Sequence, residues 1–465
     1  MYNEGTIIAL SSPPGSGAIA IIRLSGDDAI SKTDLFFKSK SGKKLSESSG
    51  YSISYGDLIE KDEVIDEVVV SVYKAPHSYT GENVIEISCH GSNYIQQRIL
   101  TLFTDAGVRL ASPGEFTLRA YLNNKKDLSQ AEAVGDLIAS ESKEEHRVAM
   151  EQMRGGYSDE IEVLREKLIH FKSLIELELD FSEEDVEFAD RSDLKTLLDE
   201  LDSKLSSLIE SFTYGNVIKE GVTVTIAGKP NAGKSSLLNA IVNEDKAIVS
   251  NIPGTTRDAI EDVTTINGVK YRFIDTAGIR ETSDEIESIG VERAKSKINS
   301  SRILIYLFDR SDITENELII EVKSYLREDL QVYLVENKID LLNNSNTDTY
   351  KENIKSLINE ENVIFYRISA LDSYLVAGLK ELISKNLKLS SQSNIIITNS
   401  RHLEALNNSL KAIESVKKGL KEGLSGDLLS IDLNDGIINI SIITGKIDVD
   451  QDILGSIFSK FCIGK

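Results

Sequence analysis

The chain has 465 residues, more than one hydrophobic core usually holds, which predicts about three domains. Hydrophobic residues make up 40% and charged residues 27%, with six prolines, a composition typical of globular, helix-rich proteins that excludes a disordered chain. The formal net charge is −23. Phosphate contacts require basic surface, so any RNA function needs a local basic patch or a basic partner, and most of the excess acid is interpreted as a solubilising surface.

The N-terminus and the cysteines indicate a cytosolic protein. The longest apolar runs, such as RILIYLF at 302–308, have the length of a strand and not of a membrane-spanning helix. The first residues, MYNEGTIIALSSPPG, lack the basic region and long apolar run of a signal peptide. Two cysteines, Cys89 and Cys462, are too few for a disulfide framework, and five scattered histidines lack zinc-ligand spacing. We therefore expect a cytosolic protein without a membrane segment.

Residues 1–120 are predicted to form a mixed α/β domain. Residues 92–107 carry apolar side chains at helical spacing and end at a glycine, which predicts a helix. β-Branched runs bounded by Gly, Pro, Ser or Asn predict strands at 6–12, 18–26, 66–75 and 83–91.

Residues 121–217 change in character and are predicted to form long amphipathic helices. The acidic run at 180–190 offers carboxylates for a metal site, but Ser182 followed by Asp185 favours a helix-capping box. Gly155-Gly156 is expected to interrupt the helical pattern. The predicted helices span 127–153, 158–181 and 192–212.

Residues 218–385 alternate strand and helix patterns, which is typical of a doubly wound parallel sheet. Helical periodicity returns within residues 386–465, strongly at 401–424 and more weakly beyond. A helical, then α/β, then helical order predicts an α/β unit inserted into one helical domain. The predicted fold class is therefore multidomain α/β plus α: an N-terminal α/β domain, a helical domain and an inserted doubly wound P-loop domain.

A phosphate-binding loop is predicted within GVTVTIAGKPNAGKSSLLNAIV at 221–242. Gly228, Gly233, Lys234 and Ser235 fit the spacing G-x-x-x-x-G-K-[ST], after a β-branched strand and at the start of a helix. Backbone N–H groups of such a loop close on phosphates, which the helix N-terminus also favours. We expect Lys234 to reach the β- and γ-phosphates and the Ser235 hydroxyl to ligate Mg²⁺.

Three further motifs indicate a GTP site, and one of them selects guanine. DTAG places Asp275 at a strand end, beside the Mg²⁺ shell, and lets the Gly278 N–H approach the γ-phosphate. NKID, from Asn337 to Asp340, follows the strand QVYLVE, and the Asp340 carboxylate can accept hydrogen bonds from N1–H and the N2 amine of guanine. Adenine offers neither donor, so the predicted ligand is GTP and not ATP. The ISA segment at 368–370 supplies backbone groups for the base.

A switch loop is predicted at 247–260, AIVSNIPGTTRDAI, where Thr256 is the candidate second hydroxyl ligand of Mg²⁺. An ordinary Gly-Pro turn is the alternative, and the TTRD context favours the switch. The predicted GTP-binding residues are Asn231, Ala232, Gly233, Lys234, Ser235, Ser236, Ser250, Asn251, Ile252, Pro253, Gly254, Thr255, Thr256, Asp275, Thr276, Ala277, Gly278, Asn337, Lys338, Asp340, Ser369 and Ala370.

The residue after DTAG is Ile279, where Ras-type enzymes carry the glutamine that orients the attacking water. GKPNAGKSSLLNA, PGTTRD, DTAGIRETSDEIESIGVERA and the terminal FCIGK resemble the MnmE (TrmE) family of bacterial tRNA-modification GTPases, a TrmE-Era-like P-loop group. The N-terminal blocks PPGSGAIAIIRLSG, SYTGENVIEISCHG and SPGEFTLRAYLNNKKDLSQAEAV extend the resemblance over essentially the whole chain.

This resemblance implies that a K⁺ ion, held when two G domains pair, replaces both the glutamine and an arginine finger. Its ligands would be Asn231, Ser250, Ile252 and Thr255, with Ile252 acting through its backbone carbonyl. The water-positioning role would pass to Glu287, with Lys234 as the other catalytic residue of the G domain. Without the resemblance, a solvated acidic face formed by Glu287 and its acidic neighbours is the favoured interpretation.

The resemblance also implies a tetrahydrofolate-binding N-terminal domain, with 5-formyl-tetrahydrofolate or a related folate as cofactor. Its contacts map to Arg23, Glu86, Lys125 and Lys465. A carboxylate can pair with the pterin N–H edge and cations with the glutamate tail. Arg23 could equally be a structural surface charge, and Lys126 is an alternative to Lys125.

Cys462 is the third candidate catalytic residue. It is fourth from the C-terminus, but Gly464 is not aliphatic and no polybasic stretch precedes it, which excludes a prenylation box. A packed helix-end thiol and a thiolate activated by Lys465 beside the folate both remain open.

The family resemblance implies a homodimeric GTPase that acts with the flavoprotein MnmG (GidA), in a heterotetramer or larger complex, on the wobble uridine (U34) of certain tRNAs. A folate one-carbon unit would contribute to an aminomethyl-type group at C5 of that base. The alternative is a ribosome-assembly switch, which shares the GTPase motifs but usually carries a basic RNA-binding module that the acidic C-terminal region lacks. A membrane-remodelling GTPase would need a membrane-inserting helix, which the sequence does not offer.

Overall fold

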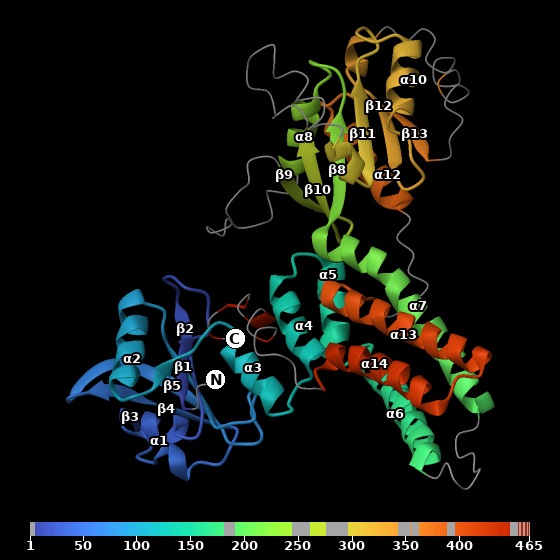
Figure 1. The fold of residues 1–465 in the computed structure, drawn as a ribbon. Helices are drawn as coiled ribbons and strands as arrows, with labels where there is room; N and C mark the ends of the chain where they lie inside the picture. The colour runs from blue at the N-terminus through green and yellow to red at the C-terminus, as the bar shows by residue number, and fades with distance from the viewer. Residues whose placement is uncertain are drawn as a thin grey trace, which may run out of the picture. The chain divides into compact units, whose positions relative to one another are not determined.

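In a computed structural model of the chain, the described residues are 5–180, 191–243, 261–275, 296–342, 362–387 and 396–446, with 354, 454, 457, 458, 461, 462 and 464. They form two compact units (Figure 1). The first comprises residues 1–140, 147–209 and 400–465, and the second comprises 141–146 and 210–399. The α/β unit is thus inserted between two helical stretches of the first, which confirms the predicted fold class.

The first unit begins with a seven-stranded sheet in the order β3-β4-β5-β6-β2-β1-β7. Its strands are β1 (Ile7–Leu10), β2 (Ile19–Ser25), β3 (Phe37–Ser39), β4 (Ser52–Glu60), β5 (Glu63–Tyr73), β6 (Val84–His90) and β7 (Arg109–Leu110), and its helices are α1 (Ala29–Asp34), η1 (Leu45–Glu47), α2 (Asn93–Asp105) and α3 (Glu115–Leu122). The four predicted strands and the helix at 92–107 are confirmed. Sequence analysis missed β3, β4 and β7, which are short or interrupted by polar residues and glycine.

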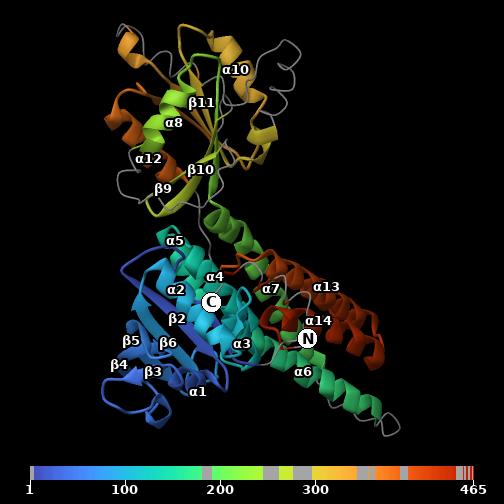
Figure 2. The same cartoon turned by 90° about the vertical axis from the view of Figure 1, so that its left-hand side faces the viewer.

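The alternation of strand side chains gives this sheet one covered and one open face. Val68, Val70 and Val72 of β5 are buried in one core with residues of α1 and α2. Figure 2 shows these two helices with the strands of the sheet. On the opposite face, Ile53 is 73% and Tyr55 50% exposed. This face is therefore apolar and open at β4 and β5, whereas α3 covers it at β1, where Phe116 packs with Ile7 and Ala9.

The helical part of the first unit consists of α4 (Leu128–Ala139), α5 (Lys143–Met153), α6 (Ser158–Asp180), α7 (Arg191–Glu220), α13 (Ser400–Glu422) and α14 (Gly426–Thr444), although the ends of α5 and α7 belong to the second unit. The prediction of one helix over 127–153 is wrong. The first helix ends at Ala139, and a second helix begins at Lys143 because Ser142 caps it. The Ser142 hydroxyl accepts a hydrogen bond from the Glu145 N–H, and the Glu145 side chain accepts one from the Ser142 N–H. The predicted break at Gly155-Gly156 is confirmed, since both residues have positive φ.

The second unit contains a six-stranded sheet in the order β13-β12-β11-β8-β10-β9, parallel except for the β9–β10 hairpin. Strand β8 lies in the middle, and its buried residues pack against α8 and α12 in one core. The elements are β8 (Val222–Ala227), α8 (Lys234–Asn243), β9 (Glu261–Ile266), β10 (Val269–Asp275), β11 (Ile303–Phe308), α10 (Glu315–Lys323), β12 (Gln331–Glu336), η4 (Ile339–Leu341), β13 (Val363–Arg367) and α12 (Ser373–Asn386).

Candidate functional sites

The phosphate-binding loop leaves the carboxyl end of β8 and leads into α8. The Lys234 side chain is buried, and its Nζ donates to the carbonyl oxygens of Gly228 and Lys229 at 2.8 and 2.9 Å. Asn231 has φ +64° and is exposed at the crest of the loop. Ser235 and Ser236 are exposed in the first turn of α8. The loop therefore brings an ammonium group, two hydroxyls and a helix N-terminus together, the combination that phosphates require.

Asn337 connects this loop with the loop that follows β13. Its side chain is buried: Nδ2 donates to the Ala232 carbonyl at 2.7 Å, and Oδ1 accepts from the Ala370 N–H at 3.0 Å. A Cβ at Gly233, where φ is +96°, would collide with the Asn337 amide, so the approach requires glycine. Three predicted motifs thus meet at the carboxyl edge of the parallel sheet, the position where doubly wound folds bind ligands.

The residues predicted to recognise the base follow β12 and β13. Lys338 has φ +61°, and its Nζ lies 2.9 Å from Oδ2 of Asp309, which follows β11. Burial opposes ionisation of the Asp309 carboxyl group. Hydrogen bonds from Ser311 and Lys338 outweigh this effect and lower the pKa of Asp309. Asp340 is exposed within η4, where its carboxylate is accessible to a base. Ser369 is buried, and its Oγ accepts from the Leu371 N–H at 3.4 Å.

Other predicted residues lie outside the described part of the chain. Asp275 ends β10, and only its backbone pairing with Ile226 is described. The predicted capping box of Ser182 and Asp185 also lies outside it. The same holds for Ser250, Asn251, Ile252, Pro253, Gly254, Thr255, Thr256, Thr276, Ala277, Gly278, Ile279, Glu287 and Lys465.

In the first unit, the structure brings Arg23 and Glu86 together on the open face of the sheet. Antiparallel pairing of β2 with β6 sets them opposite each other. Arg23 donates from Nε to Glu86 Oε1 at 2.9 Å, and its Nη2 lies 2.7 Å from the same oxygen. Glu86 Oε2 thus keeps its capacity to accept from a ligand. The guanidinium carbon of Arg23 lies 5.7 Å from the Tyr79 ring centroid and 5.6 Å from that of Phe116.

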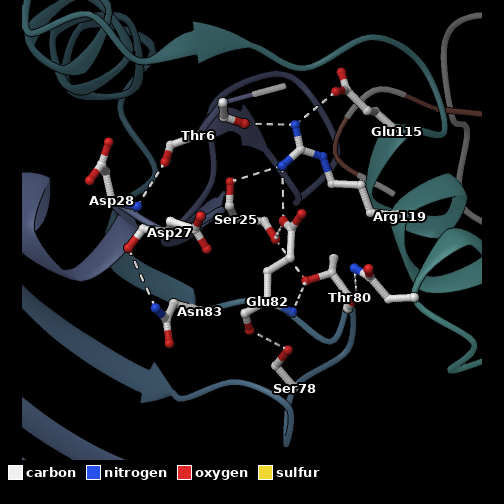
Figure 3. Close-up of polar contacts among 12 residues, drawn as sticks. Thr6, Ser25, Asp27, Asp28, Ser78, Thr80, Glu82, Asn83, Glu115 and Arg119 are labelled. Carbon is white, nitrogen blue, oxygen red and sulfur yellow. Dashed lines mark hydrogen bonds and ion pairs between the residues drawn. The ribbon is translucent and has the colours of Figure 1, made fainter. Parts of the chain in front are cut away.

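A buried arginine, Arg119 of α3, holds the segment that carries Tyr79 (Figure 3). Its Nη1 donates to Glu82 Oε2 at 2.9 Å and its Nη2 to the Gly5 carbonyl at 2.8 Å. Ser25 Oγ also donates to Glu82, at 2.7 Å. The Tyr79 hydroxyl is hydrogen-bonded to Thr117 of α3 at 2.9 Å. These contacts hold the Tyr79 ring beside Arg23, and we call Arg23, Glu86, Tyr79 and Phe116 the Arg23 cluster.

The C-terminal segment reaches the Arg23 cluster. The Gly464 carbonyl accepts from Ser11 Oγ at 3.0 Å and from Arg23 Nη1 at 3.4 Å. Cys462 is exposed and its thiol is free. The backbone carbonyl of Cys462 accepts a hydrogen bond from the Gly114 N–H at 3.4 Å. Lys125 Nζ donates to the Pro76 carbonyl at 3.0 Å, whereas Lys126 lies 6.0 Å from the Tyr79 ring centroid. Arg23, Glu86 and the C-terminal segment therefore come together.

Sequence reasoning missed four residues of this arrangement: Ser11, Tyr79, Phe116 and Arg119. Tyr79 and Phe116 lie within the blocks SYTGENVIEISCHG and SPGEFTLRAY, which already stood out in the sequence. The aromatic residues inside these two blocks were the sequence signal that could have identified Tyr79 and Phe116 as candidate site residues. Their convergence on Arg23 depends on long-range packing.

Comparison with known proteins assigns the family. Residues 6–125 match the family model of the GTP-binding protein TrmE N-terminus, and residues 128–462 match that of the MnmE helical domain. The chain belongs to the MnmE family. With its phosphate-binding loop and guanine motifs, this MnmE-family chain is a GTPase.

Curated MnmE relatives are similar over their full length. The tRNA modification GTPase MnmE of Parabacteroides distasonis is 49% identical over 99% of this chain and all of the relative. The proteins of the same name from Flavobacterium johnsoniae and Bacteroides thetaiotaomicron are 47% and 50% identical, each over all of both chains. No helix of the described residues is long and apolar enough to cross a membrane.

Proposed function

We propose that this protein is the GTP-hydrolysing component of a complex that modifies C5 of the wobble uridine, U34, in tRNA with an aminomethyl-type group. The proposal rests on full-length similarity to relatives named tRNA modification GTPase, together with the Arg23 cluster, which contacts the C-terminal segment. The GTPase unit would drive a conformational cycle, and the first unit would hold the one-carbon donor.

In the GTPase unit, the structure supports roles for the residues of the phosphate-binding loop. Lys234 is already buried next to the phosphate position and can exchange its contacts with loop carbonyls for phosphate oxygens. Asp340 is accessible to accept from guanine. Glu287 keeps its proposed role of positioning water. GTP hydrolysis would power opening and closing of paired G domains and contribute no atom to the modified base.

Two cations are proposed for this unit. Ser235 and Thr256 would hold Mg²⁺, and the exposed Ser235 hydroxyl at the N-terminus of α8 fits that role. Asn231, Ser250, Ile252 and Thr255 would hold K⁺, and the exposed Asn231 offers an amide oxygen at the loop crest. Bound there, K⁺ would neutralise charge developing between the β- and γ-phosphates, as an arginine finger does in other GTPases.

The Arg23 cluster is proposed to bind a tetrahydrofolate such as 5-formyl-tetrahydrofolate, which supplies a one-carbon unit when bound. Glu86 would accept hydrogen bonds from the pterin edge through Oε2, and the Tyr79 ring would lie beside the ligand. Lys125 and Lys465 would face the glutamate tail. Cys462 is exposed and belongs to the same C-terminal segment as Gly464. A catalytic role for its thiol beside the folate therefore stays part of the proposal.

We propose that the chain forms a homodimer and works with a flavoprotein partner, MnmG (GidA). The open sheet face supports dimerisation, because Tyr55 and Val69 are opposite each other in the β4–β5 pairing and are 50% and 38% exposed. A basic partner would carry most of the tRNA contact of a chain with net charge −23. We expect tRNA to bind weakly to this chain alone and more tightly to the complex.

Gene deletion tests the proposed function. In tRNA from the deletion strain, we expect mass spectrometry of nucleosides to show loss of the modified wobble uridine, restored by the wild-type gene and by the control Lys323→Ala. Lys323 is exposed at the end of α10. Lys234→Ala should not restore it. Unchanged wobble uridine together with accumulated ribosomal RNA precursors would contradict the proposal and favour a ribosome-assembly switch.

A further inference from the structure

A lysine-rich turn follows β3 in this acidic chain. Lys38, Lys40, Lys43 and Lys44 lie within the segment FKSKSGKK at 37–44 and are all exposed. We call residues 38–44 the lysine turn. The Lys74 ammonium lies close by, because its Nζ donates to the Ser46 carbonyl at 3.2 Å. A cluster of five ammonium groups is unexpected where the net charge is −23, so the cluster needs an explanation.

Two carboxylates beside the lysine turn are already engaged, one by Lys40 of the turn itself and one by backbone N–H groups. Asp57 accepts from Lys40 through both oxygens at 2.7 Å. The two Asp34 oxygens accept from the backbone N–H groups of Leu45 and Ser46 at 2.7 and 3.0 Å. Lys38, Lys43 and Lys44 make no ion pair within the described part of the chain. Their positive charge is therefore available to an external anion.

Protection of the sheet edge explains part of the cluster. Because β3 is an edge strand, Lys38 and the adjacent Lys40 can prevent edge-to-edge association. Lys43 and Lys44 lie beyond the strand, in the turn before η1, where no unpaired strand edge needs protection. Their presence points to a binding function. Ser39 and Ser41, with their hydroxyl oxygens 2.9 Å apart in the same turn, add donors suited to phosphate oxygens.

We propose that the lysine turn contacts the phosphate backbone of tRNA. This inference rests on the proposed tRNA function and identifies where this chain meets its substrate. Lysine ammonium groups bind phosphates as point charges, without reading base sequence. In a chain with a net charge of −23, a basic turn also orients the RNA, since the excess acidic charge elsewhere repels phosphates. The partner would still supply most of the affinity.

Lys43→Gln/Lys44→Gln tests the proposal in the full-length protein. The matched control, Lys418→Gln/Lys421→Gln, removes two exposed lysines from α13, and either variant shifts the net charge from −23 to −25. Binding of an unmodified tRNA transcript is measured by fluorescence anisotropy at several KCl concentrations, for the protein alone and with the flavoprotein partner. The GTP hydrolysis rate serves as a check of folding and should be unchanged in both variants.

We expect the Lys43/Lys44 variant to bind tRNA roughly tenfold more weakly and to lose about two units of salt slope, while the control binds like wild type. Equal weakening of both variants would mean that net charge alone acts, and would overturn the proposal. The proposal would also be overturned if the Lys43/Lys44 variant bound tRNA as tightly as wild type, whether or not it bound the partner protein more weakly. If wild type with its partner binds no tRNA, both this inference and the proposed function fail.

Discussion

The Asn337 side chain donates a hydrogen bond to the Ala232 carbonyl at 2.7 Å, which ties the base-recognition motif to the phosphate-binding loop. The same amide accepts from the Ala370 N–H at 3.0 Å, so one buried side chain holds both loops. Removal of the amide leaves the buried Ala232 carbonyl and the partly buried Ala370 N–H without their partner. Each such loss costs about 1–3 kcal/mol.

Asn337→Ala is therefore expected to weaken the binding of GTP and of GDP alike, by at least about tenfold. The reason is that the substitution disorders both loops, whereas loss of one γ-phosphate contact would affect GTP alone. Titration with a fluorescent guanine nucleotide measures both affinities. Asn439→Ala serves as control and should bind like wild type, because the Asn439 amide of α14 donates to the Asp435 carbonyl one turn earlier in the same helix. Loss of GTP affinity with unchanged GDP affinity would contradict this explanation.

Asp340→Asn is expected to change base specificity. The carboxylate accepts from the two guanine donors, whereas an asparagine amide presents a donor to the N2 position. GTP affinity should fall by at least about a hundredfold, and affinity for xanthosine triphosphate, which has a carbonyl at that position, should rise. Competition binding with both nucleotides checks this prediction. If GTP affinity stays at the wild-type level, Asp340 does not read the base.

Asn231→Ala tests the proposed K⁺ site. We expect wild-type GTP hydrolysis to be much faster in K⁺ than in Na⁺ at matched ionic strength, because the ion replaces the chemistry that Ile279 cannot supply. In the variant the K⁺ stimulation should be lost, while nucleotide affinity changes little. Equal wild-type rates in both salts would mean that hydrolysis needs an external activator.

Gly464→Ala tests whether the C-terminal segment completes the proposed folate site at the Arg23 cluster. Gly464 has φ +95°, and a Cβ there would collide with the Leu10 carbonyl, so alanine should displace the segment. Folate affinity, measured by calorimetry, should fall at least about tenfold while GTP hydrolysis by the unpaired protein stays unchanged. Gly423→Ala is the matched control, since Gly423 also has positive φ, +71°, but open space around the Cβ position. Wild-type folate affinity in Gly464→Ala would exclude a role for the docked segment.

A buried network in the helical part predicts a pH dependence of stability. His402 is fully buried; its Nδ1 is hydrogen-bonded to the Tyr157 hydroxyl, and its Nε2 lies 2.8 Å from Glu132 Oε2. Burial lowers the pKa of His402. Burial also opposes ionisation of Glu132, but contacts with His402 and Arg401 outweigh it and lower the pKa of Glu132 to about 2. At neutral pH His402 is uncharged, so Arg401 provides the positive charge opposite Glu132.

Both pKa values are lower in the folded than in the unfolded chain, so unfolding takes up protons and stability rises with pH. The contribution of His402 is complete above about pH 6.5 and declines as the pH falls below that value, and the contribution of Glu132 declines further below about pH 4.5. Amide exchange of α13, corrected for intrinsic rates, should therefore show weaker protection at pH 5.5 than at 7.5. His402→Gln should remove most of this difference. A pH-independent wild type would contradict the assignment.

The two units differ in how well the sequence predicts their sites. In the GTPase unit, the phosphate-binding loop and NKID are contiguous motifs at strand ends, and parallel strands present those ends at one edge, so their meeting follows from the fold class. In the first unit, Tyr79 reaches Arg23 through the Arg119 network, whose partners are separated by up to 114 positions. No local pattern encodes such a meeting. The helix break at Ser140–Ser142 was missed because periodicity continues across the cap.

The sequence by itself determined the order of the domains, the GTPase motifs and the family, because hydrophobic period, glycine placement and motif spacing are local properties of the chain. The tertiary structure alone decided the Arg23–Glu86 pairing, which needs the antiparallel register of β2 and β6. It also decided the docking of Gly464 on Ser11, 453 residues away, which requires the two ends of the chain to pack in one unit. Contacts of this kind depend on register and side-chain packing, which emerge only when distant elements assemble.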